Sequence, residues 1–239
     1  MKRRVGIMGG MGPQATILIM QKVLASVQAQ DDSDHIPLIV DQNTQVPSRI
    51  RHLLEGVGDD PGPVLADMAR RLVAGGAEAL AMPCNTAHHY AGAIRAAVTV
   101  PFLDMIALSV AHVADLAKDS RFIGILASPA VRKVGLFDAR LAKHGLEAIY
   151  ATDEVAMLAA IRQIKADGPQ PFARATLKAA SEEMRARGAL VQMIACTEFS
   201  LIADAVAPRT TTFDTLDLLV RAIREFALTH GAKEAQVAV

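Results

Sequence analysis

The sequence predicts an α/β fold made of two similar lobes, each a parallel sheet flanked by helices. Short apolar runs of strand length alternate with longer amphipathic stretches, as in strands joined by helical crossovers. The pattern restarts near the middle of the chain, and Cys84 and Cys196, 112 residues apart, each follow an apolar run. We expect the lobes to be related by a pseudo-two-fold axis, with the functional site in the cleft between them.

The first half alternates between the two kinds of element. Pro13 favours a helix start, because its fixed φ suits the first turn, and Gly75-Gly76 is typical of a helix end. The expected strands cover residues 5–8, 36–40, 79–82 and 100–103, and the expected helices cover residues 14–29, 61–74 and 87–97.

The second half repeats this order. Val-Gly-Ile-Met at 5–8 corresponds to Ile-Gly-Ile-Leu at 123–126, which indicates an internal duplication. The expected strands are 122–126, 148–150 and 189–194, and the expected helices are 134–144, 157–166, 173–187 and 216–229. We expect the last helix to pack back onto the first lobe, so that residues 1–105 and 213–239 form the lobe of Cys84 and residues 106–212 the lobe of Cys196. Residues after Gly231 are expected to be loosely held.

The composition excludes several classes of protein. Lys plus Arg and Asp plus Glu number 25 each, and no basic stripe alternates with aromatic residues, so we expect no nucleic-acid partner. No apolar run reaches the length of about eighteen residues typical of a membrane span, and the N-terminal stretch is too short and glycine-rich for a signal peptide. Two cysteines without a secretion signal indicate the reducing cytoplasm. The sequence therefore predicts a cytoplasmic enzyme that acts on a small molecule.

The two cysteines lie in similar settings, where an apolar strand gives way to small polar residues: Met-Pro-Cys-Asn-Thr at 82–86 and Ile-Ala-Cys-Thr-Glu at 194–198. A buried structural cysteine is common, but the repetition in both halves favours a functional pair. A thiol at a helix N-terminus meets unpaired N–H groups that favour the thiolate. Two thiols facing one pocket suit a reaction in which a proton leaves one face of a carbon and returns to the other.

These motifs carry a family resemblance. Met-Gly-Gly-Met-Gly-Pro at 8–13, Met-Pro-Cys-Asn-Thr-Ala-His at 82–88 and Ala-Cys-Thr-Glu at 195–198 resemble the cofactor-independent aspartate/glutamate racemase family, as do Pro-Ser-Arg at 47–49 and Ile-Lys at 164–165. The resemblance implies two α/β lobes with the active site between them. It also implies a homodimer that needs neither pyridoxal phosphate nor a metal.

The resemblance also implies roles for individual residues. Cys84 and Cys196 would be the two bases, one taking the α-proton as thiolate and the other delivering a proton as thiol. The substrate would be an acidic amino acid, aspartate before glutamate, and its carboxylates would need cations such as Arg49 and Lys165. The full set of expected substrate contacts is Met11, Arg49, Asn85, Thr86, Ser128, Lys165, Thr197 and Glu198.

The chain departs from the family pattern near the site. Ala195 replaces a glycine, Ser48 replaces an acidic residue, and Ala-Ser-Pro-Ala at 127–130 replaces a threonine-rich loop. Both thiols are retained, so these departures affect the expected substrate side chain rather than the expected chemistry. Two alternatives stay open. One is a cis–trans isomerase of a small unsaturated diacid such as maleate, and the other is a non-catalytic amino-acid-binding protein.

Three weaker motifs do not change this interpretation. Gly10-x-Gly12-x-x-Ala15 fits a dinucleotide fingerprint, but Asp41 comes later than the usual acidic residue. His88 and His89 follow Cys84 closely, but zinc needs three or four ligands. The cysteines also lack the C-x-x-C spacing of a redox pair. The sequence therefore predicts no cofactor and no metal.

Overall fold

The computed structural model describes residues 1–117 and 120–229. It contains two four-stranded sheets, and every strand pair in both is parallel. The first has the order β2-β1-β3-β4 and the second the equivalent order β6-β5-β7-β8. The strands are β1 (Val5–Gly9), β2 (Leu38–Gln42), β3 (Ala79–Ala81), β4 (Phe102–Leu103), β5 (Phe122–Ala127), β6 (Glu147–Tyr150), β7 (Val191–Ala195) and β8 (Thr211–Asp214). The predicted α/β fold with two parallel sheets is confirmed.

Helices flank both sheets. In the first half they are α1 (Pro13–Ala25), α2 (Pro61–Ala74), α3 (Ala91–Ala97) and α4 (Met105–Leu116). In the second half they are α5 (Pro129–Lys133), α6 (Asp138–Ala142), α7 (Glu154–Asp167), α8 (Pro171–Ala186), α9 (Thr197–Ser200) and α10 (Thr215–Leu228). Short segments of other helix types are η1 (Asp32–Asp34), η2 (Arg51–Glu55), η3 (Thr86–Tyr90) and η4 (Ala203–Ala205). No helix in the described ranges is long and apolar enough to cross a membrane.

The structure corrects three of the expected helices. The first helix ends at Ala25 instead of residue 29. The helix expected over 134–144 is wrong: α5 and α6 replace it, and Gly135 between them has φ 58°, which no α-helix accommodates. The helix expected over 87–97 begins as the tighter η3 and becomes α-helical only at Ala91. Helix α4 and strand β8 were not expected at all.

The glycine shared by the two halves has a packing reason. A Cβ atom on Gly6 of β1 would lie 2.8 Å from a methyl carbon of Leu80 on neighbouring β3. A Cβ atom on Gly124 of β5 would lie 2.8 Å from the side chain of Gln192 on neighbouring β7. Such distances are well inside van der Waals contact. Both sheets therefore need glycine at the same place in their central strand.

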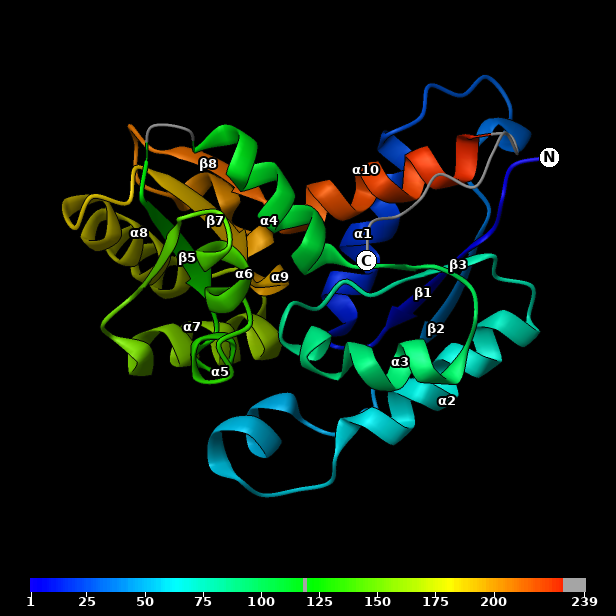
Figure 1. The fold of residues 1–239 in the computed structure, drawn as a ribbon, viewed down its shortest axis with the longest axis horizontal. Coiled ribbons are helices and arrows are strands. Elements are labelled where there is room, and N and C mark those ends of the chain that lie inside the picture. The colour runs from blue at the N-terminus through cyan, green and yellow to red at the C-terminus, as the bar shows by residue number, and fades with distance from the viewer. Residues whose placement is uncertain (118–119, 230–239) are drawn as a thin grey trace.

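The two lobes exchange a helix. Helix α4 follows β4 of the first sheet, yet its residues Ile106, Val110 and Val113 belong to the core around β5. Helix α10 follows β8 of the second sheet, yet Leu216, Leu219 and Ile223 are buried in the core around β1. Figure 1 shows α10 running beside α1, with which it is in contact. Each fully buried leucine or isoleucine contributes about 1.5–3 kcal/mol, so this exchange joins the lobes firmly.

The expected packing of the last helix on the first lobe is thus confirmed. The exact lobe boundaries, between residues 105 and 106 and between 212 and 213, stay a prediction. Residues 230–239, which include the segment expected to be loosely held, lie outside the described residues.

Candidate active site

The two cysteines lie at equivalent places, beyond the carboxyl ends of β3 and β7, the inner strands that pair with β1 and β5. Both are free thiols and both are buried. They line one cavity of about 40 Å³. The first half contributes Met11, Ser48, Arg49, Ile50, Cys84 and Thr86 to its wall, and the second half contributes Ser128, Ile161, Lys165, Cys196 and Glu198.

The thiol of Cys196 is hydrogen-bonded to a carboxylate. Cys196 is the N-cap residue of α9, and its Sγ donates to Oε2 of Glu198 at 3.0 Å. Burial raises the pKa of the Cys196 thiol well above its ordinary value; the negative charge of Glu198 raises it further, and Lys165 opposes this only in part. Cys196 is therefore protonated at neutral pH, as the donor of this hydrogen bond must be.

Glu198 also binds a lysine. Its Oε1 lies 3.1 Å from Nζ of Lys165, which comes from α7. Burial alone lowers the pKa of Lys165, but the negative charge of Glu198, together with that of the cysteines when they are ionised, outweighs this effect and raises it. Lys165 therefore stays a cation in the cavity wall. Glu198 accordingly connects a thiol and an ammonium group.

The thiol of Cys84 has different surroundings. It lies in the loop between β3 and η3, and no side chain in the described part of the protein hydrogen-bonds to its sulfur. The backbone carbonyl of Cys84 instead lies 2.8 Å from Nδ1 of the buried His88. The two thiols thus face one cavity in unequal settings.

Polar groups from both lobes meet beside the cysteines. Thr86 Oγ1 lies 3.2 Å from Ser128 Oγ, a hydrogen bond that joins the start of η3 to the N-cap of α5. Arg49 donates from Nη1 to the carbonyl oxygens of Val46 (3.2 Å) and Pro47 (2.9 Å). These bonds hold one edge of the guanidinium and position the rest of it in the cavity wall.

Two expected substrate contacts do not line the cavity. Asn85 donates from Nδ2 to Thr215 Oγ1 at 3.1 Å, and Thr197 donates from Oγ1 to the carbonyl of Pro83 at 3.1 Å. Both side chains are buried and connect the Cys84 loop to residues that follow β7 and β8. Their position indicates a structural role, holding the two cysteine loops together. Their assignment as substrate contacts stays a prediction without support from this arrangement.

Three lining residues were not among the expected contacts. Ser48 and Ile50 flank Arg49, and Ile161 lies one helical turn before Lys165 on α7. The spacing of four residues places Ile161 and Lys165 on one face of the helix. That spacing could have pointed to Ile161, but an isolated isoleucine carries no chemical signal of its own.

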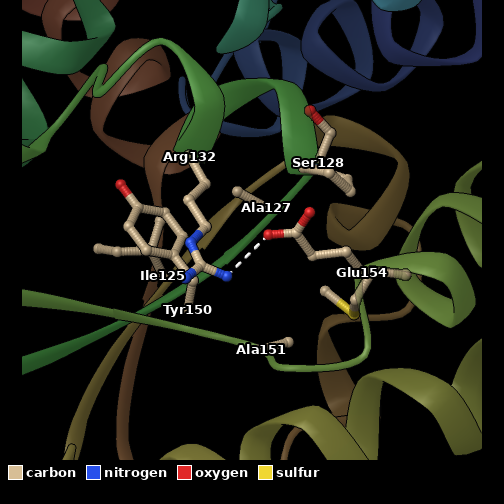
Figure 2. Close-up of a pocket in the computed structure, with 9 residues that line it drawn as sticks. Ile125, Ala127, Ser128, Arg132, Tyr150, Ala151 and Glu154 are labelled. Atoms are coloured by element: carbon tan, nitrogen blue, oxygen red, sulfur yellow. Dashed lines mark hydrogen bonds and ion pairs between the residues drawn. The ribbon is translucent and has the colours of Figure 1, made fainter. Parts of the chain in front are cut away.

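A smaller pocket of about 10 Å³ adjoins the site and shares Ser128 with it. Figure 2 shows Arg132 and Glu154 facing each other across this pocket, where Nη1 and Oε1 form an ion pair of 2.7 Å. The Arg132 guanidinium also lies 5.9 Å from the centre of the Tyr150 ring. The charge of Arg132 is therefore already compensated, in contrast to that of Arg49. The cavity with the cysteines is the better candidate for substrate binding.

Comparisons with known proteins agree on one family. Residues 8–223 match the model of the Asp/Glu/hydantoin racemase family. The chain is 24% identical over 222 residues to the broad-specificity amino-acid racemase RacX of Bacillus subtilis, covering 91% of this chain and 95% of that protein.

Two solved structures show the same fold. Picrophilus torridus aspartate racemase has a TM-score of 0.82 and 23% identity, over 94% of each chain. An aspartate racemase homologue from Pyrococcus horikoshii has a TM-score of 0.71 and 21% identity, over 95% of this chain and 99% of that one.

Proposed function

Because the chain belongs to the Asp/Glu/hydantoin racemase family, and so to the isomerases, we propose that it racemises an acidic amino acid, aspartate before glutamate. Cys84 and Cys196 are the two acid/base groups of this reaction. The observation that carries the proposal is the cavity itself: two buried thiols, one from each half of the chain, line it together with two cationic side chains.

The protonation of Cys196 suggests how the two thiols divide the work. Cys196 holds its proton in a hydrogen bond to Glu198, so in this direction Cys196 is the acid and Cys84 is the base. Cys84 Sγ removes the α-proton of one enantiomer, which leaves a carbanion at Cα. Cys196 then delivers its proton to the opposite face of that carbon. The reverse reaction starts with Cys84 as the thiol and Cys196 as the thiolate.

The carbanion requires electrostatic stabilisation, because an amino-acid Cα–H is a very weak acid. Arg49 and Lys165 are the cations of the cavity wall and bind the two carboxylates of the substrate. Arg49 offers a planar pair of N–H groups, and Lys165 offers a point charge already shared with Glu198. Fixed cations on both carboxylates spread the negative charge that forms when the proton leaves.

The test is proton NMR in D₂O with single enantiomers of aspartate, glutamate, alanine and lysine, and with maleate. We expect aspartate to lose its Cα–H signal and its optical activity together. Cys84→Ser and Cys196→Ser should each reduce racemisation by about three orders of magnitude or more. Conversion of maleate, or binding of aspartate without Cα exchange, would replace this proposal with one of its two alternatives. Turnover of alanine or lysine in preference to aspartate would overturn the acidic specificity.

We also propose that the protein is a cytoplasmic homodimer. Ile17, Met20 and Leu24 on α1 are 42–56% exposed and line a groove with Ile36 and Leu38. An apolar surface of this kind is typical of a protein interface, and two free thiols suit a reducing compartment. Light scattering should give twice the chain mass, and Leu24→Glu should give the monomer. Cell fractionation should place the protein with the cytoplasmic enzymes.

A further inference from the structure

His88 is a buried histidine whose two ring nitrogens both have backbone partners. Nδ1 lies 2.8 Å from the carbonyl oxygen of Cys84, and Nε2 accepts the backbone N–H of Met105 at 3.2 Å. A carbonyl oxygen can only accept and a backbone amide can only donate. His88 therefore carries its proton on Nδ1 and is neutral. Burial favours the same state, because it lowers the pKa of the ring.

The partner on the far side of the ring is itself firmly held. Met105 is the first residue of α4, whose N-cap is Asp104. Asp104 Oδ1 accepts the N–H groups of Ile106 (2.9 Å) and Ala107 (3.1 Å). Its Oδ2 accepts from Arg95 of α3 at 2.7 Å and from Arg140 of α6 at 3.3 Å. The start of α4 is thus fixed to both lobes, and His88 connects the Cys84 backbone to this fixed point.

The other cysteine has no need of such a side chain. The carbonyl of Cys196 accepts from the backbone N–H groups of Phe199 (2.9 Å) and Ser200 (3.2 Å), in the first turn of α9. Ser200 follows Cys196 by four residues, as His88 follows Cys84. Ser200 instead donates its hydroxyl to Asp214, the N-cap of α10. At equivalent positions, one lobe fixes its cysteine through the backbone of a helix and the other through an imidazole.

We infer that His88 is a positioning residue for Cys84, holding the Cys84 backbone at a fixed place relative to α4 so that the thiol reaches the substrate carbon. The inference rests on the proposed role of Cys84 as a base. His88 is not part of the cavity wall, so it acts through Cys84 and not on the substrate. Its other neighbours are the Phe102 ring, 5.3 Å away between centroids, and the charged groups of Asp104, Arg95 and Arg140.

Three substitutions separate the two hydrogen bonds of the ring. His88→Asn places an amide N–H where Nδ1 lies and keeps the bond to Cys84. His88→Gln places its amide near Nε2 and keeps only the bond to Met105, and His88→Ala keeps neither. We expect kcat to fall about tenfold or more in the Gln and Ala variants, with KM changed less than about threefold, because small displacements of a reacting group cost large factors in rate. His88→Asn should retain most of the activity, and His89→Ala, at the neighbouring exposed histidine, should match the unaltered protein.

A second measurement needs no substrate. Alkylation of the two thiols by iodoacetamide is followed by peptide mass spectrometry, with Cys196 as the internal reference. In the Gln and Ala variants we expect Cys84 to react about three- to tenfold faster relative to Cys196, because a released loop exposes a buried thiol. His88→Asn should leave the ratio unchanged.

Equal effects of all three substitutions on kcat, or an unchanged alkylation ratio in the Gln and Ala variants, would overturn the positioning role. If the unaltered protein racemises no amino acid, the proposed function fails. The alkylation ratio alone then decides whether His88 positions Cys84. If His88→Ala does not fold, His88→Gln takes its place in the comparison, because both variants lose the hydrogen bond to Cys84.

Discussion

The two cysteine loops are built alike and hold their sulfur atoms differently. Cys84 lies beyond β3 and Cys196 beyond β7, which are equivalent inner strands of the two sheets. The thiol of Cys196 donates to Glu198, and its backbone carbonyl is bonded within α9. Cys84 has no such carboxylate two residues on, where Thr86 stands, and its carbonyl is held by His88. The two thiols thus occupy equivalent places with different neighbours, and only Cys196 has a carboxylate that holds its proton.

After loss of a cysteine itself, the largest effect should come from removing the carboxylate that distinguishes the two loops. In Glu198→Gln, the negative charge that helps burial to raise the pKa of Cys196 is lost, so this pKa should fall. We expect racemisation to fall about a hundredfold, the usual scale for a disturbed acid/base group. The pH dependence of alkylation measures the thiol directly: the midpoint for Cys196 should move to lower pH, whereas Glu182→Gln on the surface of α8 should not move it. An unmoved midpoint would mean that Glu198 does not set the state of Cys196.

The two aspartates that begin the exchanged helices allow a second comparison. Burial opposes ionisation of Asp104, but its hydrogen bonds to Arg95 and to the Ala107 amide favour the carboxylate and lower its pKa below the ordinary value. A pKa below that of the unfolded chain stabilises the fold above about pH 4, and this contribution is lost as the pH falls from there through the lowered pKa. Asp104→Asn should therefore lower the free energy of unfolding by about 1–2 kcal/mol at pH 7, the scale of hydrogen bonds to a charged group. Urea denaturation at pH 7 and at pH 3 measures this, and the difference between the two proteins should shrink at pH 3.

Replacing each cation of the cavity with the other kind, lysine for Arg49 and arginine for Lys165, should reduce activity to different extents. Arg49 is held by two backbone carbonyls through one nitrogen, whereas Lys165 is a point charge paired with Glu198. Arg49→Lys should lower kcat/KM for aspartate about tenfold, because an ammonium group cannot keep these bonds and reach a carboxylate together. Lys165→Arg should cost less than about threefold. Arg51→Lys, at the exposed neighbour of Arg49, is the control. Equal losses in the first two variants would show that the cations are interchangeable.

The smallest effect is expected for Asp214→Asn, which should stabilise the fold, whereas Asp104→Asn should destabilise it. Burial raises the pKa of Asp214 to about 6, and its Oδ2 has no hydrogen-bond partner among the described residues. A raised pKa stabilises the fold below about pH 4, and this contribution is lost as the pH rises through 6. Asp214→Asn should therefore be more stable than the unaltered protein by about 1 kcal/mol at pH 8 and equal to it near pH 4. Thermal unfolding across this range checks it, and lower stability of the variant at pH 8 would contradict it.

Much of the fold could be predicted because its signals are local. Strands β1, β3 and β5 appear as short apolar runs, and helix α2 has a proline at its start and glycines after its end. Helix α4 was missed because it follows a two-residue strand and a single capping aspartate. The break between α5 and α6 was missed because an isolated glycine is tolerated inside many helices.

The candidate site divides in the same way. Local patterns predicted the repeated βα order, the shared glycine of Gly6 and Gly124, and the two cysteines after equivalent strands, because each involves only a few neighbouring residues. The packing of the elements was needed to show that α4 and α10 exchange lobes and that Ile161 lines the cavity while Asn85 and Thr197 do not. It also decided that Lys165 meets Glu198 and that His88 connects Cys84 to α4. These contacts join residues far apart in the chain, so their geometry depends on how whole elements pack, and no local periodicity encodes it.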